Sequence, residues 1–526
     1  MTFGESFQRK AWITLLFLAT LIFIWGEIKF GAVLIKPDES LYTQISLEMA
    51  RSHEILVPLL DGHPSFVKPP LVYWLEIAGF RLFGENLWAA RLPIWILGLL
   101  CLWLVFHLGK LLFSDKVAWG AALFLFSNVF FFQYSQADMM DVPLTFFILL
   151  TIDAWIQGCR KNPNWFLVCG VALGMVNLVK GPIGSLLCLG LMMAYCAVEH
   201  DWSFLQRKQV WLGLGLALIL GSVWPVLLFF KGYGHDWFRE FIVEENFGKF
   251  GGSRMPVKIL LIGLLGGIAP WTFLLLESFW KGIRTWGLSK ERAFLLCWIF
   301  LVFFLFCIPA RKLPHYVLPA IPACCLLIGS MPEFSFLSLI PTRILLVSIG
   351  LLWLLGIRLT QSWVVQGLIV IGGLAVFMAA LTLKNKSIRL APLFFGVLLM
   401  MLPVAFPAIQ YPNQEAQVQG LLASGKNIGV FCPDDHDLRG FELSPRFLSI
   451  EKVEKGVDFL RRGGVLVLPK REENLLKPLP FLVQRHWRVW KTGVGLGKVI
   501  EAVWSKDLFP LEEEIEAVSI ISPSFN

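Results

Sequence analysis

The sequence predicts a polytopic all-α membrane protein with a small α/β domain at its C-terminal end. Hydrophobic residues make up 56% of the chain and charged residues only 16%, whereas soluble domains average about 25% charged residues. Apolar runs of about 20 residues recur from residue 11 to about residue 409, and this is the length that a hydrocarbon core about 30 Å thick requires of a helix. Segments of about 10 alternating residues, as in a membrane barrel, are absent. We therefore expect about 13 transmembrane helices.

The expected helices are apolar runs bounded by charged residues, Pro or Gly. Two neighbouring runs, at 165–179 and 182–198, are short because Lys180, Gly181 and Pro182 divide them. The full set of expected spans is 11–31, 92–113, 117–134, 142–158, 165–179, 182–198, 210–230, 257–279, 293–310, 314–331, 341–358, 363–383 and 389–409.

The distribution of Lys and Arg predicts the orientation of these spans. If the N-terminus is cytoplasmic, the basic loops fall on the cytoplasmic side along the whole chain, as the positive-inside rule requires. An odd number of spans then leaves the C-terminus outside, and the first apolar run is typical of a signal anchor. The net charge of +8 is thus explained by basic residues in the cytoplasmic loops and does not indicate a nucleic-acid partner. The residues that carry this argument are Arg9, Lys10, Lys110, Lys116, Arg160, Lys161, Arg207, Lys208, Lys281, Arg284, Lys290, Arg292, Lys384 and Lys386.

This topology divides the chain into two expected domains. Residues 1–409 form a transmembrane domain with outer loops at about 32–91 and 231–256. Residues 410–526 form a soluble domain on the outer side.

The tail combines strand-like and helix-like segments. Asn427–Cys432 and Gly464–Leu468 are short apolar runs typical of buried strands, and the charged stretch from Ile450 to Arg462 favours a helix. This alternation predicts a small α/β domain.

Nine of the ten cysteines lie in or beside the apolar spans, and only Cys432 lies in the tail. No Cys-x-x-Cys pair occurs, so the pattern favours buried small hydrophobes over a zinc or redox site.

The first outer loop begins with a pair of acidic residues, Asp38 and Glu39, followed by Tyr42. The apolar residues after them have near-helical spacing, which favours a helix lying flat at the membrane surface. Asp38 would then be held at membrane level as a candidate base. Asp is also a common helix N-cap, so a purely structural role stays open.

Further along this loop, Lys68 stands directly before Pro69 and Pro70, and Tyr73 follows. Two prolines stop a helix and extend the backbone before them, which lets the Lys68 ammonium point toward a phosphate. An ordinary solvated lysine is the alternative.

Three ionisable residues lie at the ends of apolar spans. Asp138 and Asp141 stand three residues apart at the start of a span, where both can share one helical face. Lys180 interrupts apolar sequence on both sides, and an unpaired cation there costs about 3 kcal/mol. We therefore expect Lys180 to have an anionic partner.

A short outer turn holds Arg311, Lys312, His315 and Tyr316, against the local charge bias. Cations on the outer side favour a bound anion such as a lipid phosphate, although lipid headgroups alone would also satisfy them. The second outer loop contains Asn246 in a stretch, 244–250, that composition alone marks only as a surface turn.

Together these motifs resemble the protein O-mannosyltransferase-like superfamily, most closely its bacterial branch with the lipid A aminoarabinose transferases. The resemblance covers about the first 330 residues. Its motifs are Asp38, Glu39 and Tyr42; Lys68 to Trp74; Phe83 to Asn86; Ala89 to Pro93; Asp141 to Phe147; Lys180 to Pro182; Glu245 to Phe247; and Lys312 to Pro319.

The resemblance implies a polytopic C-type glycosyltransferase fold in a bacterial inner membrane. It implies that a sugar moves from a polyprenyl phosphate carrier to an envelope acceptor: lipid A, a protein or another glycan. The acidic positions of the family carry over onto Asp38 and Asp141, and its lysine onto Lys68. Where some relatives have a metal-binding Glu, this chain has Val67, so no metal cofactor is firmly expected.

The expected mechanism is an inverting attack on the anomeric carbon, which needs a base and neutralisation of the leaving phosphate. A multi-span lipid or solute transporter or flippase is the alternative. Transporters more often show broken helices in two related halves, which this sequence lacks. The expected site residues are Asp38, Glu39 and Asp141 for catalysis; Lys68, Lys180, Arg311, Lys312 and Tyr316 for the donor phosphate; and Tyr42, Tyr73, Asp138, Asn246 and His315 for substrate binding.

Overall fold

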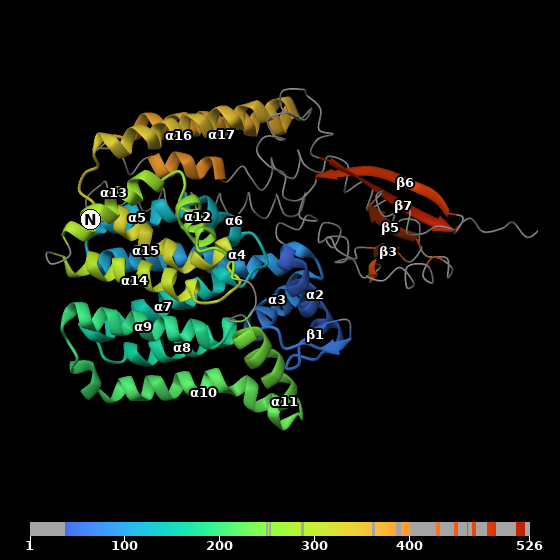
Figure 1. Cartoon of the computed structure of the whole chain (residues 1–526), viewed down its shortest axis with the longest axis horizontal. Helices are drawn as coiled ribbons and strands as arrows, with labels where there is room; N and C mark the ends of the chain where they lie inside the picture. Colours follow the sequence, from blue (N-terminus) through green and yellow to red (C-terminus); the bar gives the residue numbers. More distant parts are fainter. Residues whose placement is uncertain are drawn as a thin grey trace, which may run out of the picture.

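A computed structural model gives the fold of most of the chain (Figure 1). It describes residues 37–60, 62–248, 251, 254–285, 289–359, 363–384 and 391–399. In the C-terminal part it describes 428–431, 447–450, 460, 465–469, 481–490 and 512–520. The expected span at 11–31 lies outside the described residues, as does nearly all of the charged stretch from Ile450 to Arg462.

Helices make up the described part of the chain up to residue 399. The first outer loop contains two of them and a two-stranded antiparallel ribbon: α2 (Pro37–Ser52), β1 (Leu59–Leu60), β2 (His63–Pro64) and α3 (Leu71–Phe83). The following helices are α4 (Leu87–Leu112), α5 (Asp115–Phe126), α6 (Val129–Ser135), α7 (Asp141–Arg160), α8 (Trp165–Lys180), α9 (Pro182–Glu199), η1 (Ser203–Gln206), α10 (Lys208–Phe230), α11 (Gly234–Trp237), η2 (Phe238–Phe247), α12 (Lys258–Gly267), α13 (Thr272–Arg284), α14 (Lys290–Cys307), η4 (Pro314–Ala320), α15 (Ile321–Gly329), α16 (Phe336–Leu355), η5 (Gly356–Leu359) and α17 (Trp363–Thr382).

The expected apolar runs between 92 and 383 all fold as helices, but not all as single straight spans. Within the described residues, six helices are long and apolar enough to cross a membrane, or up to eight if each bent pair forms one span. The expected span at 117–134 is the pair α5 and α6, bent by 66°, and the one at 257–279 is α12 and α13, bent by 107°.

The break between the two short runs lies where the sequence placed it. Helix α8 ends at Lys180 and α9 begins at Pro182, with Gly181 between them at φ +80°. Glycine adopts this conformation without strain. A side chain at Gly181 would also collide with the ring of Phe241 in η2, which occupies the space beside the break.

Small residues bring α8 and α10 into close contact. A Cβ atom added to Gly170 of α8 would lie 2.0 Å from the carbonyl oxygen of Gly213 in α10. Without a hydrophobic force between helices in lipid, close approach through small residues is a main source of packing energy. The long span α10 is held to the rest of the helices in this way.

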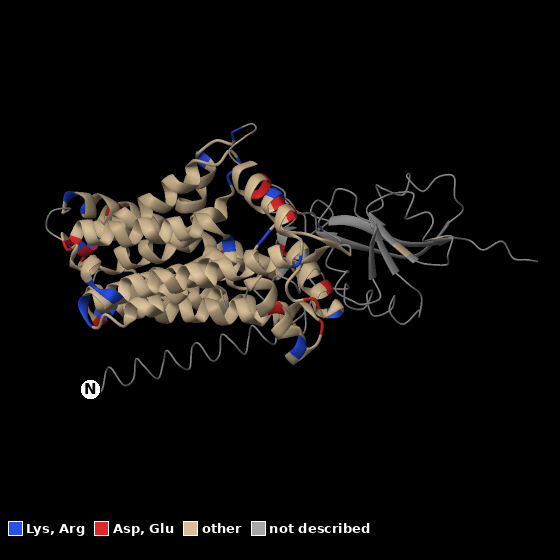
Figure 2. Ribbon diagram, turned by 90° about the horizontal axis from the view of Figure 1, so that it is seen from below, with Lys and Arg blue, Asp and Glu red and all other residues tan. Residues whose placement is uncertain are grey.

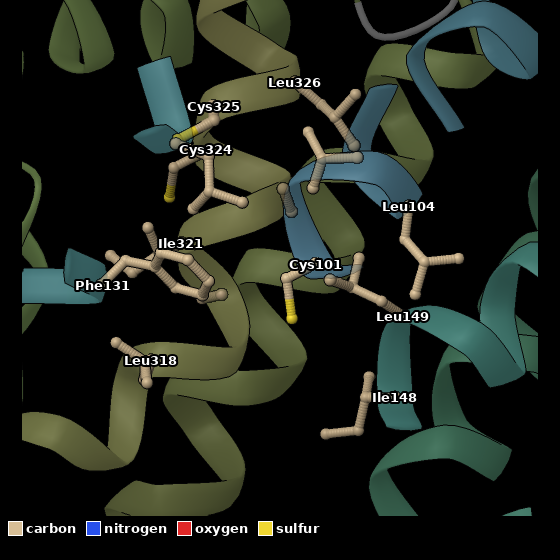
Figure 3. Close-up of a cluster of buried hydrophobic side chains, with 14 of the residues drawn as sticks. Cys101, Leu104, Phe131, Ile148, Leu149, Leu318, Ile321, Cys324, Cys325 and Leu326 are labelled. Carbon is tan, nitrogen blue, oxygen red and sulfur yellow. The ribbon is translucent and has the colours of Figure 1, made fainter. Parts of the chain in front are cut away.

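Apolar side chains from several helices form one core (Figure 3). Figure 3 shows Cys101 of α4 near Leu149 of α7, and Cys324 and Cys325 of α15 near Ile321. The nine cysteines within the described residues are free thiols, six of them buried. The expected role of these cysteines as small hydrophobes is therefore confirmed for those six.

Charged residues gather at the two ends of the helical body, and the stretch between them is almost free of them (Figure 2). Helices α2 and α3 lie at one of these ends (Figure 1).

Five strands form a mixed sheet in the C-terminal part, with the order β4-β3-β5-β7-β6. Strand β3 pairs in parallel with β4 and β5, and β7 is antiparallel to both β5 and β6. The two expected strands correspond to β3 and β5. The strands are β3 (Ile428–Phe431), β4 (Phe447–Ile450), β5 (Val465–Pro469), β6 (Phe481–Trp490) and β7 (Glu512–Ile520).

Candidate active site

A cluster of buried charged groups lies where α2, α3 and α4 meet the segment before α7. Arg91 of α4 and Glu39 of α2 form a bidentate ion pair, with Nε to Oε1 at 2.7 Å and Nη2 to Oε2 at 3.0 Å. Both side chains are almost completely buried, at 1% and 0% exposure. The planar guanidinium matches the two carboxylate oxygens, so the pair is held in one geometry.

Asp138 joins the same cluster. Its backbone amide donates to Oε1 of Glu39 at 2.8 Å, and its Oδ2 accepts from the hydroxyl of Thr43 at 2.8 Å. Glu76 of α3 lies against it, and its side chain is also completely buried. We call Glu39, Glu76, Arg91 and Asp138 the buried carboxylate cluster.

Burial is the largest influence on the pKa values of two members of this cluster, Asp138 and Glu76. It raises the pKa of Asp138 to about 7, with the negative charge of Glu39 adding to the effect. Burial and the neighbouring Asp138 carboxylate raise the pKa of Glu76 well above its usual value. Carboxyl groups with raised pKa values beside a candidate catalytic residue are typical of active sites.

Asp38 is the residue directly before this cluster. It lies in the first turn of α2, and its side chain is outside the described part of the structure. Its neighbour Glu39 is fully occupied by Arg91 and the amide of Asp138.

A second charged group surrounds Asp141, the first residue of α7. Its Oδ1 accepts from the ammonium of Lys180 at 2.8 Å, and His315 Nε2 lies 3.8 Å from its Oδ2. The ammonium of Lys180 also lies 5.2 Å from the ring centroid of Tyr316. Lys180 therefore has the anionic partner expected from sequence. We call Asp141, Lys180, His315 and Tyr316 the Asp141 cluster.

Asp138 and Asp141 do not share a helical face, contrary to the expectation from their spacing. Helix α7 begins only at Asp141, and the chain before it turns, with the Met139 amide bonded to the Ala137 carbonyl at 2.8 Å. Asp138 consequently enters the buried carboxylate cluster and Asp141 the other. The i, i+3 rule applies only inside a helix, which explains the error.

An ion pair ties the two outer loops together beside these clusters. Lys68 donates to Oε2 of Glu245 in η2 at 2.7 Å, with side-chain exposures of 14% and 24%. The charge of Lys68 also acts on Asp141. The stretch at 244–250 is thus more than the surface turn that composition suggested.

The remaining expected residues differ in their surroundings. Lys312 is buried and donates to the Pro309 carbonyl at 2.6 Å, whereas Arg311 is exposed. Tyr42 contacts Tyr73 ring to ring, with centroids 6.4 Å apart. Asn246 donates to the Phe241 carbonyl at 2.6 Å.

Four residues of the site were missed by sequence reasoning: Glu76, Arg91, Thr43 and Glu245. Arg91 and Glu76 carried a signal, because each is a charged residue within an apolar helical stretch, as Lys180 is. Glu245 stands in one of the family motifs but was given no role there, and Thr43 carried no signal; their partners lie 177 and 95 residues away.

No group of three or more His, Cys, Asp or Glu side chains that could hold a metal ion occurs among the residues whose placement is described.

Comparison with solved structures identifies the fold. The chain superposes on ArnT from Cupriavidus metallidurans with a TM-score of 0.71, covering 97% of this chain and 98% of that one at 19% identity. The fold is that of a C-type glycosyltransferase. The same protein has also been solved bound to undecaprenyl phosphate, with a TM-score of 0.71.

Sequence comparisons agree with this C-type glycosyltransferase fold. Residues 67–229 match the dolichyl-phosphate-mannose-protein mannosyltransferase family. An undecaprenyl phosphate-alpha-4-amino-4-deoxy-L-arabinose arabinosyl transferase of Pseudomonas fluorescens is 29% identical over 56% of this chain. A protein with the same description from Edwardsiella ictaluri is 28% identical over 59%. The resemblance inferred from the sequence motifs is thereby confirmed.

The matches span little more than half the length of these two curated relatives, 55% and 57%. Both the Lys68–Glu245 pair and the Asp141 cluster draw residues from beyond the family match as well as from within it, since Glu245, His315 and Tyr316 follow residue 229.

Proposed function

We propose that this protein is an integral membrane glycosyltransferase that moves a sugar from a polyprenyl phosphate carrier to a lipid, protein or glycan acceptor of the cell envelope. The observation that carries the proposal is the arrangement of Lys68 and Lys180. Both ammonium groups are part-buried, and both act on Asp141 at the outer ends of the helices. The names of the similar arabinosyl transferases support a polyprenyl-phosphate-linked donor.

The proposed chemistry needs a base and a group of cations. Asp38 takes the proton of the acceptor hydroxyl, or orients a phosphate acceptor, as the acceptor attacks the anomeric carbon with inversion. Glu39, whose oxygens are occupied by Arg91 and the Asp138 amide, holds the start of α2 in place rather than acting as a second base.

The leaving phosphate is neutralised by Lys68 and Lys180, with exposed Arg311 and buried Lys312 at the same outer turn. Fixed cations act most strongly where water is excluded. In the structure the two lysines hold Glu245 and Asp141. A phosphate that binds between the two lysines would replace these carboxylates as the partner of both ammonium groups.

Aromatic and polar groups around these cations form the proposed sugar and acceptor surface. Tyr316 and His315 belong to the Asp141 cluster, Asp138 belongs to the buried carboxylate cluster, and Tyr42 and Tyr73 lie beside that second cluster. Asn246 follows Glu245 in η2. No metal is part of the proposed site, because Val67 occupies the position where some relatives carry a metal-binding Glu.

The proposed topology has about 13 spans with the N-terminus in the cytoplasm of a bacterial cell. Residues 1–409 form the transmembrane domain, and 410–526 form a periplasmic α/β domain that contains the five-stranded sheet.

Replacement of Lys68 tests the function directly. Lys68→Ala should weaken binding of a polyprenyl phosphate and slow transfer about ten- to a hundredfold, since a charge-assisted hydrogen bond contributes about 1.5 to 3 kcal/mol. Lys68→Arg should restore only part of the donor binding and transfer rate, because the planar guanidinium of arginine does not fit a site shaped for a compact ammonium. Binding is measured by calorimetry in detergent, and transfer with envelope extracts as acceptor.

Lys231→Ala is the matched control for Lys68→Ala. Lys231 also pairs with a glutamate, Glu54, at 2.7 Å, but it is more exposed, at 44%. The control should bind and transfer normally. If both variants behaved alike, Lys68 would be no more than a surface ion-pair partner and the proposed donor site would be wrong.

A further inference from the structure

Two carboxyl groups meet inside the protein where α3 faces the segment before α7. Glu76 and Asp138 both have 0% exposure, and their carboxyl groups lie within hydrogen-bonding reach of each other. Two carboxylate ions can only accept hydrogen bonds, so a bond between them requires a proton on one of the two. Neither carboxyl group was assigned a chemical step in the proposed transfer reaction.

Neighbouring hydrogen-bond donors do not satisfy the oxygens of these two carboxyl groups. Within the described residues, both oxygens of Glu76 and Oδ1 of Asp138 are buried and accept no ordinary hydrogen bond. The hydroxyl of Thr43 donates a hydrogen bond to the other oxygen of Asp138, Oδ2. The hydroxyl of Ser46 lies within reach of Glu76 as well, and it donates to the Tyr42 carbonyl at 3.0 Å.

The surrounding charges do not favour two ions here either. The one cation of the cluster, Arg91, faces three carboxyl groups and is held in a bidentate pair by one of them, Glu39. Tyr73, whose hydroxyl is also buried without a partner among the described residues, lies where the charge of Glu76 acts on it. Burying two adjacent, unneutralised carboxylates is too costly, so one of them takes up a proton.

We propose that Glu76 and Asp138 share one proton at neutral pH, and that this acid–carboxylate pair is a clamp that positions Lys68 relative to Asp141. Lys68 lies three residues before the start of α3, which carries Glu76, and Asp141 lies three residues after Asp138. Glu76 thus acts as a positioning residue, because its contact with Asp138 joins the start of α3 to the segment before α7. Loss of the shared proton would leave two buried charges that repel each other and separate α3 from the start of α7.

Infrared spectroscopy of the full chain in detergent tests the proton itself, without any substrate. The wild type at pH 7 should show the carbonyl stretch of a protonated carboxyl group from the pair, and Glu76→Gln should lack it. In the variant an amide donates to Asp138, which then stays ionised. An identical band in wild type and variant would overturn the proposal.

Glu54→Gln is the matched control for this measurement. Glu54 is partly buried, which by itself raises its pKa, but the Lys231 ammonium and the amides of Leu56 and Val57 lower it below its usual value. Glu54 is therefore ionised at pH 7, and its replacement should leave the protonated-carboxyl band unchanged. Loss of the band in this control as well would show that the band does not belong to the pair.

The pH dependence of unfolding tests the clamp. The pKa values of Glu76 and Asp138 are raised by folding, so their contribution to stability is complete below the pKa of the unfolded chain and is lost as pH rises through that of the folded pair. The melting temperature of the wild type should fall as the pH rises from about 4 through about 7, and that of Glu76→Gln should fall less. Equal slopes for the two would overturn the clamp.

Transfer activity connects the clamp to the proposed function. Because the side-chain amide introduced by Glu76→Gln remains a donor at every pH, the activity of this variant should decline at a higher pH than that of the wild type. A variant that binds donor and folds, yet keeps the alkaline limit of the wild type, would rule out a positioning role for Glu76. If no variant or wild-type protein transferred sugar at all, the proposed function would fail, while the infrared and unfolding results would still decide the shared proton.

Discussion

At the scale of single residues, the site combines ionised groups that are paired and ionised groups left for chemistry. Glu39 and Asp38 are neighbours in sequence, but Glu39 points into the protein, where Arg91 neutralises it. The pair with Arg91 assigns Glu39 a structural role, and the proposed base is therefore Asp38.

Asp38→Asn should abolish transfer while leaving folding and donor binding largely intact, because the change keeps the shape of the side chain and removes its charge and basicity. Turnover is measured with a polyprenyl-linked sugar, and donor binding is measured separately by calorimetry. Near-normal turnover would mean that Asp38 only caps α2, and that Asp141 or Asp138 has to be considered as the base.

Arg91→Met should destabilise the protein by about 3 to 5 kcal/mol, because it leaves the carboxylate of Glu39 buried without a partner. Arg51→Met is the control: Arg51 pairs with Glu85 at 2.8 Å, but both side chains are more than a third exposed. An exposed pair contributes about 0 to 1 kcal/mol. Thermal unfolding in detergent compares the two, and equal losses would contradict the structural role assigned to Arg91.

At the scale of helices, breaks and close contacts bring the site residues together. The break at Gly181 ends α8 at Lys180, so the ammonium lies at the C-terminal end of this helix and reaches Asp141 at the start of α7. Phe241 of η2 fills the space beside Gly181, and the same segment carries Glu245, the partner of Lys68. The second outer loop is therefore part of the site and not only a connection.

The contact between α8 and α10 depends on particular glycines. Gly213→Ala should destabilise the protein, because its Cβ would lie 2.2 Å from the carbonyl oxygen of Phe166, and overpacking typically costs about 1 to 3 kcal/mol. Gly215→Ala makes the same change two residues along the same helix, where nothing lies within 4 Å. Since alanine favours helix more than glycine does, the Gly215 variant should be neutral or slightly stabilised. A stable Gly213→Ala protein would show that the two helices separate easily.

At the scale of the whole molecule, the orientation in the membrane decides which face carries the chemistry. A cysteine placed in the tail beyond residue 410 should react with an impermeant label in intact spheroplasts. This follows from the basic loops, which the positive-inside rule assigns to the cytoplasm. A cysteine placed in the loop between α7 and α8, next to Lys161, is the control and should react only after lysis. The opposite pattern would place every proposed site residue on the cytoplasmic side.

The helical membrane class and the positions of most helices could be predicted from the sequence alone, and so could several residues that the structure brings together in the candidate site. Apolar runs of sufficient length and the breaks at Lys180, Gly181 and Pro182 are local properties, because a helix satisfies its backbone hydrogen bonds within its own segment. The motifs around Asp38, Lys68, Asp141 and Lys180 could be recognised for the same reason: each is a short stretch of consecutive residues.

The tertiary structure is needed to show which of these residues are partners. It separated Asp138 from Asp141, paired Lys68 with Glu245, and brought Arg91, Glu76 and Thr43 to Glu39 and Asp138. It also showed that two expected spans are sharply bent pairs of helices. These contacts join residues far apart in the chain, and apolar length and charge bias carry no information on which helices pack together. The pairing of buried charges depends on that packing, since burial is what makes an unpaired charge costly.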